Sequence, residues 1–436
     1  MTRKSLCFGA SWPQASCRCT SETLPITVCI DVQFGGDVKK YLNAGRNESA
    51  YYFWTNEQLR TGLTSNGSVN NLTNLRATWY EQRWIGLDSA VNALLIDNVD
   101  QQYVDLHDAI ISEWKSLINV RSPLEVSDGW KLVVDAGRRF NVTSKSNGRR
   151  YAVEFDVNGS GGISSLLDIE SGIDYVGGGN ERNVFGEFVY QTMDEEDFRN
   201  YIDSVWYRWR SSLDYGKYRL DEIANFTKHQ YVGGRFRNLY VLKDDEGDFK
   251  TFLVEMDLGP FQGDLQRDYG AMDRVFVVYD FNAESATFTM ELVLINKTYS
   301  RIPEALYLTF KPQECRRWTV DKIGSAVDVG NVMKNGSYHL HGVIGNTSCV
   351  LNNGKGISFH SVHSGLVTFK PQYADSTSDF YNEFTVFPSP LVNASESDGF
   401  AYVLGNNAWG TNYAMWYPFD SINSNQTFSF QVHLPL

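Results

Sequence analysis

The spacing of the apolar residues changes near Pro123, and this change constrains the fold more than any other feature of the chain. Before Pro123, apolar residues recur every three or four positions in two stripes, at 72–94 and 103–117, which is the period of amphipathic helices. After it, apolar and polar residues alternate, most clearly at 151–157, 288–294 and 428–434. The pattern predicts a helix pair followed by many short strands.

A chain of 436 residues exceeds one typical core, so we expect several domains. Residues 1–33 show no period, 34–122 predict a helical bundle, and 123–436 predict β-sandwiches. Glycine-rich breaks separate the strands, and a helical insertion is expected near 194–210. The predicted fold class is α+β, and mainly β.

Charge and hydropathy narrow the range of partners. The net charge of −13 disfavours nucleic acid, because binding to phosphates needs a basic face. No apolar run approaches the roughly 20 residues of a membrane-spanning helix. We therefore expect neither a nucleic-acid nor a membrane partner.

Asparagine sequons indicate passage through the secretory pathway. Chance predicts about four Asn-x-Ser/Thr triplets in a chain of this composition. Eleven occur, at Asn47, Asn66, Asn71, Asn141, Asn158, Asn225, Asn296, Asn335, Asn346, Asn393 and Asn425. The alternative is a chain that is merely rich in Asn, Ser and Thr. The first residues lack the apolar segment of a signal peptide.

Two cysteines fit an oxidising compartment. Cys315 and Cys349 lie in predicted strands and would suit a disulfide. Four further cysteines fall within the first 29 residues, but their spacing is not that of a zinc site.

Two segments indicate carbohydrate chemistry. RIPEALYLTFKP (301–312) predicts a strand opened by a proline turn, and NNAWGTNYAMWYPF (406–419) combines aromatic side chains with carboxamides. A pyranose offers an apolar C–H face and a rim of hydroxyls, which aromatic rings and amides match. The predicted sugar-binding residues are Trp409, Asn412, Trp416 and Tyr417. Core packing is the alternative for aromatic residues in a β-rich chain.

Histidine pairs are the best metal candidates in the sequence. His339-x-His341 would point to one face of a strand, and His360-x-x-His363 forms a second pair. Asp321 and Asp328 are near in sequence, but half-buried strand histidines are the plainer interpretation. The run Asp194-Glu195-Glu196-Asp197 predicts the acidic first turn of a helix.

Nine short motifs occur in order along the chain: GGDVKKYL (35–42), FWTNEQL (53–59), TWYEQRW (78–84), EFVYQT (187–192), DYGK (214–217), RIPEALYLTF (301–310), WTVDKIG (318–324), YHLHGV (338–343) and NNAWGTNYAMWYPF (406–419). Together they resemble a fungal and bacterial family related to glycoside hydrolase family 38, whose long members begin with an α-mannosidase-like domain. The resemblance covers about residues 34–436.

The resemblance implies a helical bundle followed by mannosidase-type β-sandwiches, the largest a supersandwich like the mutarotase-related domains. In the full-length relatives, an N-terminal α/β barrel carries the zinc ion and the nucleophilic Asp. The H-x-H-x-D stretch that opens such barrels is absent from this sequence. The resemblance therefore implies zinc only with that barrel and no cofactor in this chain.

Three functions fit the sequence, and the first of them is the leading hypothesis. The first is a truncated, carbohydrate-related protein without the catalytic barrel. The second is a free-standing mutarotase-like or lyase-like enzyme, with His339, His341, Asp321 and Glu187 as its candidate residues. The third is a secreted carbohydrate-binding protein without turnover.

Overall fold

The computed structural model describes thirteen segments of the chain: 120–126, 129–177, 184–197, 228–242, 250–297, 304–313, 315–322, 325–330, 339–352, 354–369, 383–386, 399–406 and 424–435. The expected N-terminal region 1–33 and nearly all of the helical bundle 34–122 lie outside them. Of the helical insertion expected near 194–210, the structure describes the beginning, where Glu195, Glu196 and Asp197 are helical.

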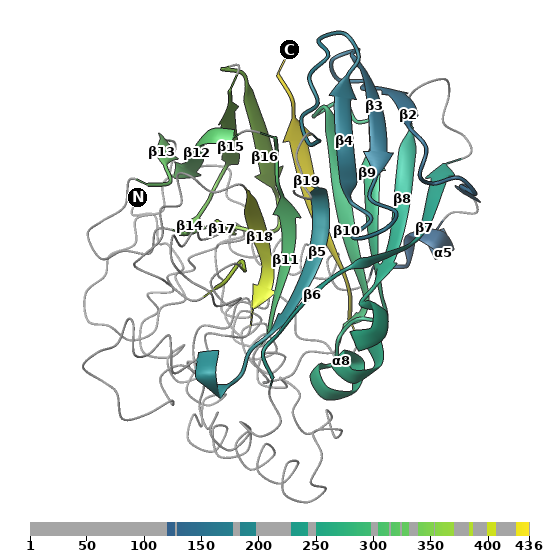
Figure 1. Ribbon diagram of the computed structural model, residues 1–436, viewed down its shortest axis with the longest axis vertical. Coiled ribbons are helices and arrows are strands. Elements are labelled where there is room, and N and C mark those ends of the chain that lie inside the picture. The colour runs from purple at the N-terminus through teal and green to yellow at the C-terminus, as the bar shows by residue number, and fades with distance from the viewer. Residues whose placement is uncertain are drawn as a thin grey trace, which may run out of the picture.

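The described residues form two large antiparallel sheets, as the alternating pattern predicts (Figure 1). The first sheet has ten strands. In spatial order they are β1 (Trp130–Leu132), β7 (Arg235–Leu242), β8 (Thr251–Asp257), β9 (Arg274–Asp280), β10 (Phe288–Lys297), β19 (Ser424–His433), β16 (Gly356–Ser361), β15 (Asn346–Leu351), β12 (Cys315–Lys322) and β13 (Ser325–Asp328).

The second sheet has nine strands. Their order is β14 (Leu340–Gly342), β17 (Leu366–Phe369), β18 (Phe400–Asn406), β11 (Glu304–Phe310), β5 (Phe185–Thr192), β4 (Ile163–Asp168), β3 (Arg150–Phe155) and β2 (Phe140–Thr143). The ninth strand, β6 (Gln230–Gly233), pairs with β5. Strand β5 meets β4 only at Phe185, so β6 occupies the other end of the same side of β5.

Aromatic side chains join the inner faces of the two sheets. Phe310 of the nine-stranded sheet lies 4.9 Å from Phe359 of the ten-stranded sheet, between ring centroids, and 5.4 Å from Phe400. Trp318 packs edge-on to Phe400 at 5.2 Å. Each fully buried aromatic or aliphatic side chain stabilises the fold by roughly 1.5–3 kcal/mol. This shared core fixes the two sheets against each other.

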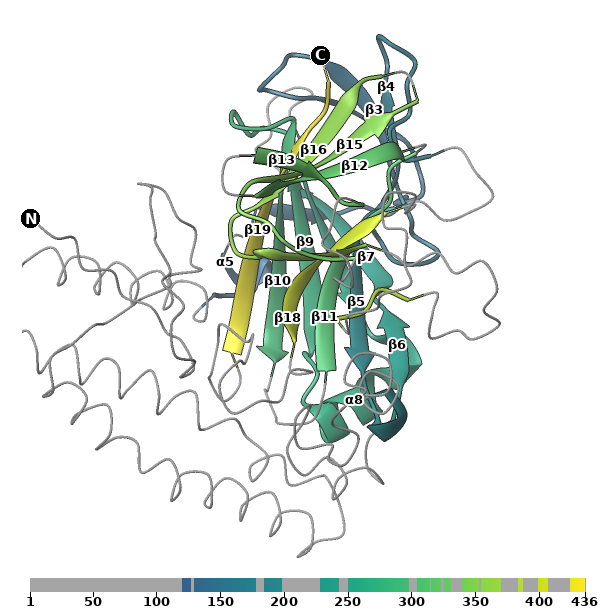
Figure 2. The ribbon, with the colours of Figure 1, turned by 90° about the vertical axis from the view of Figure 1, so that its left-hand side faces the viewer.

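Short helices lie at the ends of the strands. They are α5 (Pro123–Val126), the 3₁₀ turn η3 (Gly259–Phe261) and α8 (Gln262–Tyr269). Helix α8 ends at Gly270, whose φ of 67° is the left-handed conformation that closes a helix without strain in glycine. Both views place α8 at the lower end of the molecule, near β6 (Figures 1 and 2). There the backbone N–H of Lys228 donates to the hydroxyl of Tyr269.

Strand β11 is buried on both faces, although its sequence alternates. All seven of its residues are buried. One reason is the segment 383–386, which lies over the outer face: the Thr368 hydroxyl donates to the Thr385 carbonyl, and Tyr307 hydrogen-bonds the backbone of Val386. The two polar side chains that β11 places on this face, Tyr307 and Thr309, are therefore enclosed rather than solvated.

Among the described residues, no helix is long and apolar enough to cross a membrane.

Candidate functional site

The aromatic residues predicted to bind sugar, Trp409, Asn412, Trp416 and Tyr417, lie outside the described residues.

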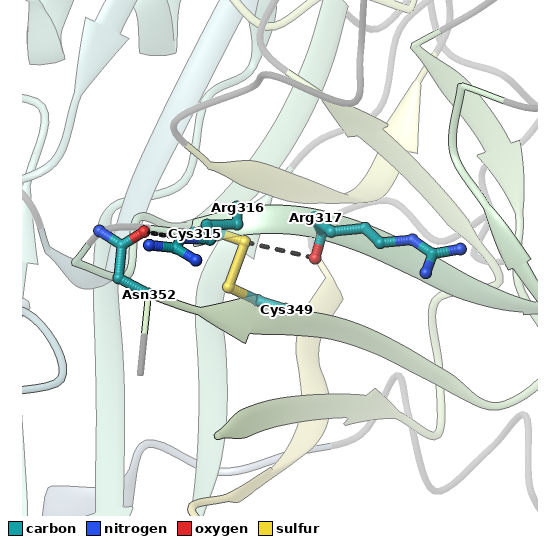
Figure 3. Close-up of a disulfide and its surroundings, with 5 residues drawn as sticks. All are labelled: Cys315, Arg316, Arg317, Cys349 and Asn352. Atoms are coloured by element: carbon teal, nitrogen blue, oxygen red, sulfur yellow. Dashed lines mark hydrogen bonds between the residues drawn. A yellow bond between two sulfur atoms is a disulfide. The ribbon is translucent and has the colours of Figure 1, made fainter. Parts of the chain in front are cut away.

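Cys315 and Cys349 are joined by a disulfide between β12 and β15 (Figure 3). Their Cα atoms are 5.7 Å apart, and the neighbouring register pairs Trp318 with Cys349. The side chain of Arg316 donates to the Asn352 carboxamide across the same strand pair. The bond ties two neighbouring strands together and has a structural role.

The histidine pairs do not form a metal centre with other described groups. His339 and His341 are both buried in the core, at 0% and 2% exposed, and Phe369 packs against the His341 ring. The ring of His360 contacts the Gly345 carbonyl, and His363 accepts from the backbone N–H of Ser429. Nowhere in the described segments do three His, Cys, Asp or Glu side chains converge on a possible metal position.

The four residues proposed for a free-standing enzyme are not gathered at one place. Successive cross-strand pairs put His341, Val367, Tyr402, Leu308 and Phe188 on the inner side of the nine-stranded sheet. Glu187 is the neighbour of Phe188 and so points to the outer side. Asp321 belongs to the ten-stranded sheet, where its carboxylate accepts from the Asn346 N–H.

The outer face of the nine-stranded sheet carries a different group of polar residues, which we call the outer-face cluster. Three strands and two adjoining segments contribute to it. Its members are Glu187 and Gln191 of β5, Tyr231 of β6, Tyr307 and Thr309 of β11, Lys311, His229, Asp197 and Glu383. Alternation brings the strand residues to one side, because neighbouring cross-strand pairs share a face.

His229 is the centre of the cluster. Its Nδ1 lies 3.0 Å from Oδ2 of Asp197, and its Nε2 lies 3.0 Å from Oε2 of Glu383. Hydrogen bonds to Asp197 and then to Glu383 raise the pKa of His229 to about 10, against the opposing effect of burial. The ring is thus an imidazolium at neutral pH. It cannot accept a proton there, and it instead holds two carboxylates in place.

A helix start positions Asp197. The Oδ1 of Asp194 accepts from the backbone N–H of Asp197, and the Oδ2 of Asp197 accepts from the N–H of Asp194. This is a reciprocal capping arrangement at a helix N-terminus. The other oxygen of Asp194 accepts from the N–H of His229, so the cap and the start of β6 are fastened together.

Glu383 is held from a second side by Gln191. The Gln191 amide donates to the same Oε2 at 3.4 Å, and its carbonyl oxygen accepts from the Tyr307 hydroxyl at 2.7 Å. The chain of contacts therefore runs from β11 through β5 to Glu383 and His229. These side chains restrict one another, which is what a preorganised polar site requires.

Tyr231 of the cluster has a raised pKa, to which Glu187 and Glu383 both contribute. Burial raises its pKa most, and the negative charges of Glu187 and Glu383 raise it further. Glu187 lies 3.4 Å from Nζ of Lys311, and the Thr309 hydroxyl donates to the same Glu187 oxygen. The side chains of His229, Glu187 and Lys311 are 28%, 24% and 23% exposed, so this part of the cluster keeps contact with solvent.

The opposite face of the same strands carries a fully buried ion pair. The Nζ of Lys297 lies 2.8 Å from Oε1 of Glu304 and also donates to the Gly270 carbonyl, while Tyr190 donates to Glu304. Burial lowers the pKa of Lys297, and the Glu304 charge opposes that change. Both charged side chains are 0% exposed, so this pair is structural.

Little in the sequence predicts the outer-face cluster. His229 is 32 residues from Asp197 and 154 residues from Glu383, so no motif spacing joins them. One usable signal is the acidic run at Asp194–Asp197, which predicts the acidic first turn of a helix. The acidic run also binds His229 through Asp194 and Asp197. These contacts depend on tertiary packing, because His229 lies in a later segment of the chain.

No protein-family model and no curated protein matches the sequence. Similar solved structures include an α-mannosidase from Enterococcus faecalis, at 11% identity and a TM-score of 0.38, covering 67% of this chain and 30% of that one. A galactose mutarotase-like protein from Lactobacillus casei has 9% identity and a TM-score of 0.37, covering 68% of this chain and 100% of that one. A galactose mutarotase-like protein from Clostridium acetobutylicum has 10% identity and a TM-score of 0.33, covering 70% of this chain and 97% of that one.

Proposed function

We propose that the outer-face cluster binds carbohydrate. The supporting observation is that carboxylates, an amide, phenols and cations converge on one partly exposed face and brace one another. Sugar hydroxyls both donate and accept hydrogen bonds, so they need such a mixture of partners. The motifs that resemble a carbohydrate-active family favour the same class of ligand.

The net charge of the outer-face cluster indicates whether its sugar ligand is charged or neutral. Asp197, Glu187 and Glu383 are negative, whereas His229 and Lys311 are positive. Because acidic groups outnumber basic ones, a uronic acid or a sulfated sugar would meet net repulsion. Neutral oligosaccharides are the ligands that this site favours.

Calorimetric titration with neutral oligosaccharides, including mannose-containing ones, tests the proposal. Tyr231→Phe and Glu187→Gln should each weaken binding about tenfold, since a hydrogen bond to a charged group contributes roughly 1.5–3 kcal/mol. Glu291→Gln is the matched control, because Glu291 is an exposed carboxylate on the ten-stranded sheet. Binding that survives both variants unchanged would place the sugar elsewhere.

Catalytic turnover is the second candidate function, because the charges of Glu187 and Glu383 both raise the pKa of Tyr231. Glycosidic cleavage uses two carboxyl groups near one bond, one of them as an acid. Incubation with aryl mannosides and oligosaccharides, with and without zinc, separates turnover from binding. An enzyme would lose rate in Glu187→Gln and Glu383→Gln while still binding ligand. Absence of product at high protein concentration would leave binding alone.

A further inference from the structure

The described segments contain five of the eleven sequons, and their asparagines differ in environment. Asn141 is exposed on β2, between the buried Phe140 and Val142. Asn158 is exposed in the turn between β3 and β4. No hydrogen bond joins either carboxamide to another described residue, so both amide nitrogens can carry a substituent without loss of a native contact.

The carboxamide of Asn425, by contrast, is hydrogen-bonded through both of its polar atoms. Its Nδ2 donates to the Val120 carbonyl at 2.7 Å, and its Oδ1 accepts from the backbone N–H of Asn296 at 2.9 Å. The side chain is half-buried. A glycan on this nitrogen would have to leave through the packed surface around Val120 and would disturb a contact that spans 305 residues.

We propose that Asn141 and Asn158 carry N-linked glycans and that Asn425 does not. In the reaction, the Asn Nδ2 forms a bond to the anomeric carbon of a lipid-pyrophosphate-linked oligosaccharide. The bond from that carbon to the pyrophosphate oxygen breaks, the lipid pyrophosphate leaves with the electron pair, and the amide loses one proton. Transfer requires an accessible sequon, and the folded chain must then tolerate the product.

Both sites lie at one edge of the molecule. Strand β2 is the last strand of the nine-stranded sheet, and Asn141 pairs there with Ala152 of β3 (Figure 1). Asn158 follows the end of β3 by a few residues. Exposed edge strands invite pairing with another chain, and proteins protect them with bulky or charged groups. Glycans at these two positions would cover that edge with hydrophilic mass.

The experiment is a glycopeptide map of the full chain secreted from a eukaryotic host. Enzymatic glycan release in heavy-oxygen water converts each occupied asparagine to labelled aspartate, which peptide mass spectrometry locates. Label is expected at positions 141 and 158 and not at 425. Label at 425, or unlabelled asparagine at both 141 and 158, would overturn the proposal, and so would a chain that carries no glycan at all.

Three variants check the map. Asn141→Gln and Thr143→Ala should each remove one glycan, seen as one step in electrophoretic mobility, because both destroy the same sequon. Asn425→Gln should leave the mobility unchanged but lower the thermal unfolding midpoint, since its amide contacts with Val120 and Asn296 are lost. A mobility step in Asn425→Gln would contradict the assignment.

Discussion

Strands β5 and β11 carry charged groups on both of their faces, and the two groups differ in what they can do. On the inner face, Lys297 and Glu304 are 0% exposed and sit in the core that joins the sheets. On the outer face, His229 and Glu383 keep 28% and 15% of their side-chain surface exposed. The charged side chains of both groups form hydrogen bonds, but only the outer group keeps surface in contact with solvent. Accessibility, rather than charge, separates a candidate site from a structural pair.

The buried pair should show the largest effect on stability. Lys297→Met leaves the Glu304 carboxylate in the core without its cation, which should cost about 3–5 kcal/mol of unfolding free energy. Chemical denaturation measures it. Lys145→Met is the control, because Lys145 and Glu284 form an exposed pair that should contribute less than about 1 kcal/mol. Equal losses in the two variants would remove the distinction between buried and exposed pairs.

His229→Gln should cost less, about 1.5–3 kcal/mol, because Asp197 and Glu383 lose a charged hydrogen-bond donor but can be partly hydrated. Chemical denaturation of His229→Gln measures this loss of unfolding free energy. A loss larger than that of Lys297→Met would mean that the outer-face cluster is part of the structural core, contrary to the comparison.

Alkaline pH should weaken the outer cluster. The folded pKa of His229 is about 10 and the ordinary value is 6.5, so its stabilising contribution is complete below about pH 6.5 and is lost as pH rises toward 10. After allowance for solvent screening, we expect a loss of about 1–2 kcal/mol between pH 7 and 9. Unfolding curves at several pH values measure it, and His229→Gln should lack this slope. A wild-type stability that rises over this range would contradict the assignment.

The smallest expected difference in unfolding free energy is that between the variants of two buried tyrosines, Tyr190 and Tyr307. Tyr190 donates to the charged Glu304, whereas Tyr307 donates to the neutral Gln191. Tyr190→Phe should therefore cost about 1 kcal/mol more than Tyr307→Phe, since hydrogen bonds to charged groups are stronger. Thermal and chemical unfolding of both variants tests the ranking. A reversed order would indicate that the outer face contributes more to stability than the inner one.

Much of the β architecture could be predicted from the sequence, because alternation is a local signal. The residues 288–294 and 428–434 form β10 and β19, which pair with each other from Phe288 and Val432 onward. The pairing order of the strands was not predictable in the same way, since it joins segments far apart in the chain. The same limit applied to the site. Asp197, His229 and Glu383 meet only because three separate segments pack together, at separations of 32 and 154 residues that no motif spacing joins.

The disulfide between Cys315 and Cys349 has a consequence for protease mapping. It closes a covalent loop with a sequence separation of 34 residues. A single backbone cut inside that loop leaves both fragments attached through sulfur, so nicked material would migrate as one band on a non-reducing gel. Thiol treatment before electrophoresis would then release two pieces, and their sizes would show where the protease entered.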